Sequence, residues 1–192
     1  NAASFFAVVI AIYSMNIKEM AGRSTTHPLK AIKEGLAYVF NHSKIRPVLF
    51  LTAVSSIFGW PYATLMPVYS KDILKKGATG LGYLYSMAGL GAVIGSLITS
   101  AYSVRFGTIK FVFAGMLLTG FFIATLSFVN SYIMALVVLF FVGFSLILTF
   151  SMLNATVQLH VHDEFRGRAM SIYSMMFVGV GAFGALFMGS LS

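Results

Sequence analysis

Long uncharged runs separated by short charged segments dominate the pattern of this chain. Residues 111–161 and 169–192 contain no Lys, Arg, Asp or Glu, whereas residues 158–168 (QLHVHDEFRGR) hold the densest group of ionisable side chains. A charge at the centre of a bilayer costs roughly 2.5–3.5 kcal/mol on insertion scales. We therefore expect the uncharged runs to span a membrane, and the charged segment to form a turn at its surface.

Apolar runs of about 20 residues, the length that crosses a bilayer as a helix, predict five full spans after residue 47. The expected spans are residues 48–69, 81–103, 109–129, 132–156 and 169–192. The first run is about 14 residues and too short to cross alone, so we interpret residues 1–15 as the end of a truncated helix. The predicted fold class is an all-α polytopic membrane protein.

Residues 16–47 form a polar, basic segment that contains one amphipathic helix. Apolar side chains recur on one side of it at helical spacing, and charged side chains occupy the other. These are Leu29, Ile32, Leu36, Val39 and Phe40 against Lys30, Lys33 and Glu34. The pattern predicts a loop whose helix lies in the membrane interface. A surface helix packed on a soluble domain is the alternative.

The first full span is interrupted by Gly59-Trp60-Pro61 and again by Pro67. Proline removes a helical hydrogen bond, and a break at membrane depth persists only where neighbours or a water-filled cavity satisfy the freed carbonyl. We therefore predict a bent helix that lines a cavity and takes part in gating. A kink that only shapes packing is the alternative.

Small residues predict close helix packing in two other spans, at Gly91-xxx-Gly95 and at Gly181-xxx-Ala185-xxx-Gly189. The two spans also resemble each other. The segment YSM at 85–87 followed by GLGA matches YSM at 173–175 followed by GVGA, with a gap of two residues. This similarity predicts an inverted three-helix repeat of the kind found in secondary transporters. Chance similarity is the alternative.

The composition supports a membrane protein, with 58% hydrophobic residues and 9% charged residues against roughly 25% charged in soluble domains. The net charge of +8 does not indicate nucleic-acid binding, because Lys and Arg fall only in the gaps between apolar runs. Ten of the 13 basic residues lie on one side of the predicted topology. The positive-inside rule therefore places residues 16–47 and the 158–168 turn in the cytoplasm.

The 158–168 segment resembles the loop between the tenth and eleventh helices of major facilitator superfamily transporters, through Gln158, Asp163-Glu164 and Arg166-Gly167-Arg168. The enterobactin-exporter-type (transmembrane secretion effector) branch is the most similar, although His162 stands where that branch commonly has Pro. The resemblance extends over nearly the whole chain. It implies the C-terminal half of a transporter without its last helix, whose partner is a missing N-terminal half.

The resemblance also makes residues 48–69 and 132–156 the seventh and tenth helices, which line the central cavity of such transporters. The substrate-cavity candidates are Trp60, Tyr62, Ser145, Thr149 and Asn154. The gating and cytoplasmic-loop candidates are Gln158, Asp163, Glu164, Arg166, Arg168 and Arg105, the last in a turn that keeps only Arg105 and Gly107 of a superfamily motif. The alternatives are hydroxyls bonded to their own helix and solvated loop charges.

Enzymatic chemistry is not expected, because the spans hold no group of ionisable side chains. His160, His162, Asp163 and Glu164 lack fixed metal-binding geometry, so we predict no metal and no cofactor. The expected function is export of a small amphipathic molecule, siderophore- or drug-like, by alternating access in a bacterial plasma membrane. The lipid bilayer and that substrate are its partners. A membrane scaffold or receptor with the same fold is the alternative.

Overall fold

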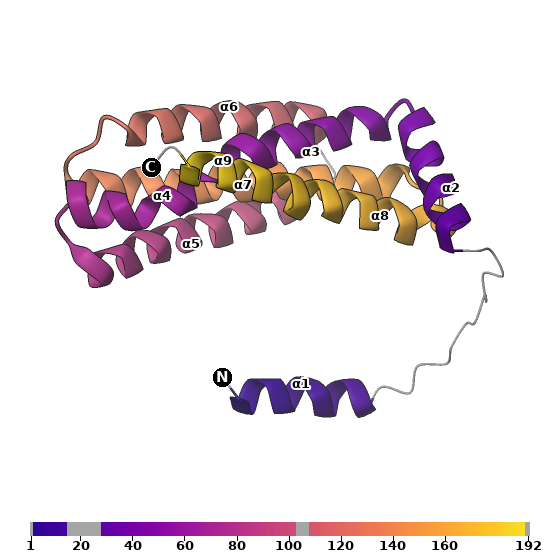
Figure 1. Ribbon diagram of the computed structural model, residues 1–192, viewed down its shortest axis with the longest axis horizontal. Helices are drawn as coiled ribbons and strands as arrows, with labels where there is room; N and C mark the ends of the chain where they lie inside the picture. Colours follow the sequence, from indigo (N-terminus) through magenta and orange to yellow (C-terminus); the bar gives the residue numbers. More distant parts are fainter. Residues whose placement is uncertain (1, 15–27, 103–107, 191–192) are drawn as a thin grey trace. The chain divides into compact units, whose positions relative to one another are not determined.

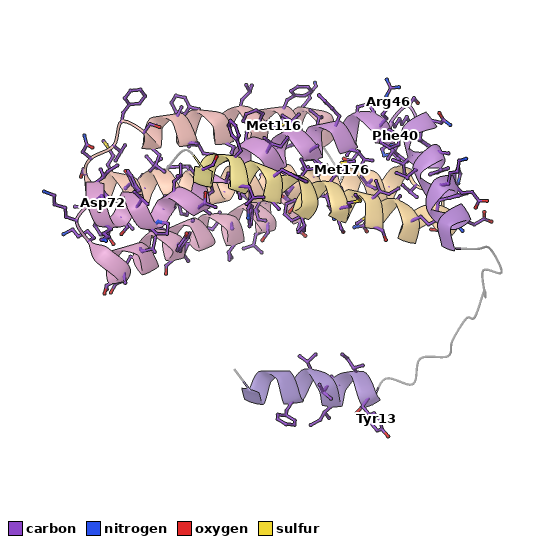
Figure 2. All side chains as sticks on the ribbon, in the orientation of Figure 1. Tyr13, Phe40, Arg46, Asp72, Met116 and Met176 are labelled. Carbon is purple, nitrogen blue, oxygen red and sulfur yellow. The ribbon has the colours of Figure 1, made fainter. Side chains whose placement is uncertain are left out.

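The computed structural model describes residues 2–14, 28–102 and 108–190. All regular secondary structure in these ranges is helical. The chain divides into two compact units, residues 1–31 and 32–192. The first unit contains α1 (Ala2–Ser14), an apolar helix whose Tyr13 is exposed (Figure 2).

The second unit is a bundle of long helices (Figure 1). Its elements, of which α2 begins in the first unit, are α2 (Pro28–Asn41), α3 (Ile45–Gly59), α4 (Tyr62–Val68), the π-helix η1 (Tyr69–Ile73), α5 (Gly77–Tyr102), α6 (Thr108–Leu126), α7 (Tyr132–His160), the 3-10 turn η2 (Asp163–Phe165), α8 (Arg166–Ser174), the π-helix η3 (Met175–Gly179) and α9 (Val180–Ser190). Four helical segments are long and apolar enough to cross a membrane: Ile45–Ile73, Gly77–Ala101, Tyr132–His160 and Asp163–Phe187. Lys110–Leu126 is a shorter apolar helix. The all-α membrane fold is confirmed, and the number of five spans stays a prediction.

Helix α7 is the centre of the bundle and packs against α5, α6 and α3 (Figure 1). A helix that is apolar all round belongs in a core or a membrane, and α7 carries no Lys, Arg, Asp or Glu. Its Val142, Met152, Leu153 and Val157 are fully buried. Helices α5 and α7 approach each other backbone to backbone, because a Cβ on Gly91 would overlap the carbonyl oxygen of Phe140.

Helices α3 and α4 are separated by the expected break at residues 59–61. Pro61 has no N–H to donate to the carbonyl of Ile57, four residues earlier. Helix α9 packs directly on this point. A Cβ on Gly184 would lie 2.7 Å from the Ile57 oxygen and 2.9 Å from the Pro61 ring. The break is therefore covered by protein.

Pro67 does not interrupt its helix, contrary to the sequence prediction, because α4 continues through it to Val68. The carbonyl that Pro67 leaves without an intrahelical donor is that of Ala63. The hydroxyl of Tyr85, on α5, donates a hydrogen bond to this carbonyl over 2.9 Å. A neighbouring helix thus satisfies the freed group, which is how proline is tolerated inside membrane helices.

The last helical segment is continuous but irregular. Its α-helical parts α8 and α9 are joined by the π-helix η3. A turn of π-helix contains more residues than a turn of α-helix, because its hydrogen bonds join residues five apart. The two-residue gap in the match between residues 85–92 and 173–182 falls inside η3. Both η3 and α9 pack against α3. The two irregular helices of the bundle are therefore neighbours.

The two ends of the bundle differ in their contacts. Figure 2 places Arg46 at one end and Asp72 at the other. At the Asp72 end, the Tyr69 hydroxyl donates to the Val129 carbonyl over 2.6 Å, which ties the end of the first long segment to the end of α6. Helix α2 crosses the opposite end, beside the start of α8 (Figure 1).

Candidate functional site

Four aromatic side chains meet where α7, the last helical segment and the α3–α4 break come together. The ring of Phe177, on η3, lies 4.6 Å from that of Phe150 and 5.8 Å from that of Trp60, both edge to face. The ring of Tyr173 is stacked at 6.4 Å from Phe177, and its hydroxyl donates to the Phe150 carbonyl over 3.1 Å. Edge-to-face pairs are favourable arrangements for aromatic rings, so these contacts hold the rings of the cluster in a fixed arrangement.

Two hollows adjoin this cluster and share Phe177. The larger, of about 660 Å³, has Phe150, Tyr173 and Phe177 in its wall. The smaller, of about 530 Å³, is lined by Trp60, Thr64, Phe177 and small residues of α9. We call the pair the double hollow. Its volumes lie in the range of small-molecule sites, which is roughly 300–1,000 Å³.

The polar groups of the double hollow are uncharged. Asn154 and Gln158, one turn apart on α7, line the larger hollow, and the Gln158 amide nitrogen donates to the Asn154 side-chain oxygen over 2.5 Å. Ser151 and Ser174 add hydroxyl groups. No Asp, Glu, Lys or Arg occurs among the described residues that line either hollow. The site therefore offers ring faces and amide hydrogen bonds.

Helix α2 holds the turn between α7 and α8 through several contacts. The Arg168 guanidinium donates to the Glu34 carboxylate over 3.2 Å. The ring of Tyr38 stacks on Phe165 at 4.3 Å with 5° between the planes, and the His162 amide donates to the Tyr38 hydroxyl over 3.3 Å. We call this set of contacts the α2 clasp. It holds the N-terminal end of the α8–α9 segment, which carries Tyr173 and Phe177.

Comparison with known proteins identifies the family. The sequence pattern of the transmembrane secretion effector family, a branch of the major facilitator superfamily, matches residues 1–192. The chain belongs to this family. The family expected from the 158–168 turn is therefore confirmed. The chain is also 25% identical over 173 residues to the uncharacterized MFS-type transporter YfmI of Bacillus subtilis (strain 168). No solved structure matches the chain.

The match to YfmI covers 88% of this chain and 43% of the relative. The chain thus spans less than half the length of the curated relative that it matches. Together with the apolar helices, family membership makes the chain an integral membrane protein of a transporter family. The double hollow is accordingly a feature of one part of such a protein.

Only some of the predicted substrate-cavity residues line the double hollow. Trp60 and Asn154 line the two parts of the double hollow. Tyr62 lines a separate hollow with Ile123 of α6. Thr149 lines another, between α3, α6 and α7. Residues 149 and 154 are about 140° apart around a helix with 3.6 residues per turn, so they face different neighbours.

Two of the predicted hydroxyl residues are bonded inside the bundle. Ser145 is fully buried and accepts a hydrogen bond from the Thr119 hydroxyl of α6 over 2.9 Å. The Thr149 hydroxyl donates to the Ser145 carbonyl over 2.9 Å, within α7. These hydrogen bonds belong to the packing of α6 on α7 and to α7 itself. They match the alternative interpretation, in which such hydroxyl groups bond within the helices rather than to a substrate.

The predicted gating and cytoplasmic-loop residues also lie at different sites in the structure. Arg168 belongs to the α2 clasp, and Gln158 to the double hollow. Arg166 pairs with Asp163 over 2.8 Å within the exposed turn, where Glu164 is exposed as well. Arg105 lies outside the described residues.

Sequence reasoning missed the aromatic side chains that form most of the site. Phe150, Tyr173 and Phe177 are not among the predicted cavity residues, because the prediction rests on polar residues inside the spans. The spacing of Tyr173 and Phe177, four residues apart, places two rings on one helix face and was a usable signal. Glu34 is predicted only as part of an interfacial helix, and Tyr38 is not among the predicted site residues. The partners of both lie about 130 residues away in sequence.

Proposed function

We propose that this chain is part of a secondary active transporter that exports a small amphipathic molecule, siderophore- or drug-like, by alternating access. The double hollow is the substrate-binding surface of this part of the transporter. The observation that carries the proposal is the position of its smaller hollow between the break at residues 59–61 and the π-helix η3. That hollow shares Phe177 with the larger one, which lies between η3 and α7.

Alternating access moves groups of helices against one another around the binding site, and helices that can bend adjust to that movement. Sharp helix bends occur at proline and at π-bulges, and π-bulges are frequent at functional sites. Trp60 belongs to the break and Phe177 to η3, and their rings are 5.8 Å apart. A movement of either segment therefore changes the walls of the double hollow.

The walls indicate the chemistry of the substrate. Ring faces of Trp60, Phe150 and Phe177 pack against apolar or planar groups. The amides of Asn154 and Gln158 exchange hydrogen bonds with hydroxyl or carbonyl groups. Because the lining residues carry no formal charge, a charge on the substrate is met by another part of the transporter. The missing N-terminal half is the partner that supplies that part.

The proposed orientation places the end with the α2 clasp in the cytoplasm of a bacterial cell, following the positive-inside rule. The described carboxylates Glu34, Asp72, Asp163 and Glu164 then lie near one or the other end of the bundle. An intramembrane proton carrier lies inside the bundle, where gating switches its access. If protons energise export, the coupling group is therefore expected in the N-terminal half.

Transport by the full-length protein in proteoliposomes tests the proposal, with siderophores and amphipathic dyes as substrates. We expect energised, saturable flux. Trp60→Ala and Phe177→Ala are each expected to raise the half-saturation concentration by about tenfold, because each removes a ring from the double hollow. Phe128→Ala is the matched control, since Phe128 is 85% exposed. Equal effects of all three variants would contradict the assignment of the site.

The alternative function is a scaffold or receptor with the same fold. It predicts binding to the double hollow without flux. Binding that Phe177→Ala weakens, together with no transport of any bound compound under a proton or sodium gradient, would support this alternative and overturn the transporter proposal.

A further inference from the structure

A hollow outside the proposed substrate site lies at the corner between α2 and α3. Its volume is about 500 Å³. It is lined by Phe40 of α2, by Arg46, Pro47, Leu49, Phe50 and Ala53 of α3, and by Met176 of η3. Figure 2 labels Phe40 and Arg46 together at this end of the bundle and shows Met176 further along it. We call it the corner hollow.

The rim of the corner hollow is cationic. Arg46 lines the hollow and is exposed, and Lys44, two residues earlier in the chain, is exposed as well. Arg46 has no acidic partner within 4.0 Å among the described residues. Glu34, an acidic residue of the adjoining helix α2, pairs with Arg168. The amides of Ile45 and Arg46 both donate to the His42 carbonyl, so a bonded turn holds the cations at the start of α3.

The wall of the corner hollow is apolar and aromatic. Phe50 is 68% exposed and Phe40 is 48% exposed, with Ala53 and Met176 deeper along the bundle. Exposed phenylalanine rings beside a cation fit the boundary between lipid headgroups and acyl chains, with the rings on the apolar side and the cation on the polar side. Arg is suited to this position because its guanidinium binds a phosphate with two parallel hydrogen bonds.

We propose that the corner hollow binds one anionic phospholipid. Its phosphate is held at Arg46 and Lys44, and one acyl chain lies along Phe50 and Ala53 toward Met176. Basic pockets between membrane helices on the cytoplasmic side bind anionic headgroups in this way. An apolar protein helix in the same place would remove Arg46 from water without a counter-charge, which is unfavourable. An anionic lipid supplies that counter-charge.

The bound lipid would touch the same π-helix that lines the substrate site. Met176 lines the corner hollow and Phe177, the next residue, lines the double hollow. Consecutive residues of a helix point in different directions, about 100° apart in an α-helix, so the two ligands would contact different sides of η3. The proposal itself concerns lipid binding and does not depend on the transport function.

Native mass spectrometry of the full-length protein with added phosphatidylglycerol tests the site. We expect one phosphatidylglycerol to be retained in preference to phosphatidylcholine, and Arg46→Gln to weaken its retention about tenfold, as loss of a charged hydrogen-bond partner does. Arg46→Lys should recover part of it. Lys71→Gln is the matched control, because Lys71 is an exposed lysine in η1, the segment that ends the span at the other end. Equal retention by Arg46→Gln and Lys71→Gln overturns the proposal.

A second variant distinguishes a lipid bound inside the corner hollow from a lipid held only by non-specific attraction to a charged surface. Ala53→Leu leaves the charge unchanged and fills the apolar part of the corner hollow, so we expect it to reduce phosphatidylglycerol retention as well. Cross-linking from one introduced thiol identifies the occupant. None of the 192 residues of this chain is a cysteine, and any cysteine elsewhere in the full-length protein is first replaced by Ser. A photoactivatable cross-linker attached at Ala53→Cys should capture phosphatidylglycerol. Capture of another segment of the same protein instead would show a helix-packing site and overturn the proposal.

Discussion

The group formed by α5, α6 and α7 differs from the pair formed by the α3–α4 segment and the α8–α9 segment. In the first group the helices are uninterrupted, and the α5–α7 contact leaves no room for a Cβ at Gly91 or Gly143. In the pair, both segments are irregular at the level where they meet. We infer that the bundle combines a rigid group with a deformable pair. The double hollow lies where the two meet, because α7 forms most of the wall of its larger part and the α3–α4 and α8–α9 segments line its smaller part.

The largest effect is expected from Gly143→Ala at the α5–α7 contact. The added Cβ would overlap the backbone carbonyl of Ala88, which cannot rotate away as a side chain can. We expect a loss of about 3 kcal/mol in unfolding free energy, at the upper end for overpacking, and a low yield of folded protein. Thermal unfolding in detergent measures it. Gly120→Ala is the control, because a Cβ there meets nothing within 4 Å. Equal melting temperatures would refute a rigid α5–α7 contact.

A smaller effect is expected from Gly184→Ala, in the deformable pair. Its Cβ would lie 2.7 Å from the Ile57 oxygen and 2.9 Å from Pro61, a smaller overlap than a Cβ on Gly143 would make with the Ala88 oxygen. We expect about 1–2 kcal/mol of destabilisation, together with reduced transport by the full-length protein. Thermal unfolding and proteoliposome flux measure the two effects. Destabilisation as large as that of Gly143→Ala would show that the two contacts are equally rigid.

Tyr85→Phe tests the link between the two regions. It removes the hydroxyl that donates to the Ala63 carbonyl, so we expect a loss of about 1 kcal/mol. Pro67→Ala supplies a backbone N–H for the same carbonyl. In the Pro67→Ala background, Tyr85→Phe should therefore have little effect. Unfolding free energies of the four proteins in this cycle measure the coupling, and additive effects would contradict the hydrogen-bond explanation.

The smallest effect is expected at the α2 clasp. Glu34 and Arg168 are both partly exposed, and pairs of this kind contribute roughly 0–1 kcal/mol. Glu34→Gln should lower the unfolding free energy within that range, less so at high salt. The charge-reversed pair Glu34→Arg with Arg168→Glu should restore it. Asp163→Asn is the control, because its partner Arg166 lies in the same turn. Failure of the reversed pair to restore stability would argue against an electrostatic role.

Local sequence pattern was enough for the fold class, because membrane spans depend on runs of apolar residues and on the high cost of buried charge. The run from 111 to 161, the basic gaps and the 158–168 turn together predicted a helical membrane protein and its family. The Gly59-Trp60-Pro61 break was also readable, since proline acts on its own helix. The effect of Pro67 was not, because Tyr85 of another helix supplies the missing donor.

The candidate site depended on the tertiary structure. Trp60 and Asn154 were identified from their own spans, but which side of each helix faces which neighbour is set by packing. Packing placed Thr149 against α6 and gathered Phe150, Tyr173 and Phe177 around one hollow. The partners in the α2 clasp are likewise far apart in sequence. The sequence by itself determined which segments are apolar helices and where they weaken, because those properties are local. Only the tertiary structure decided which weak points meet, because contacts between distant helices depend on the whole bundle.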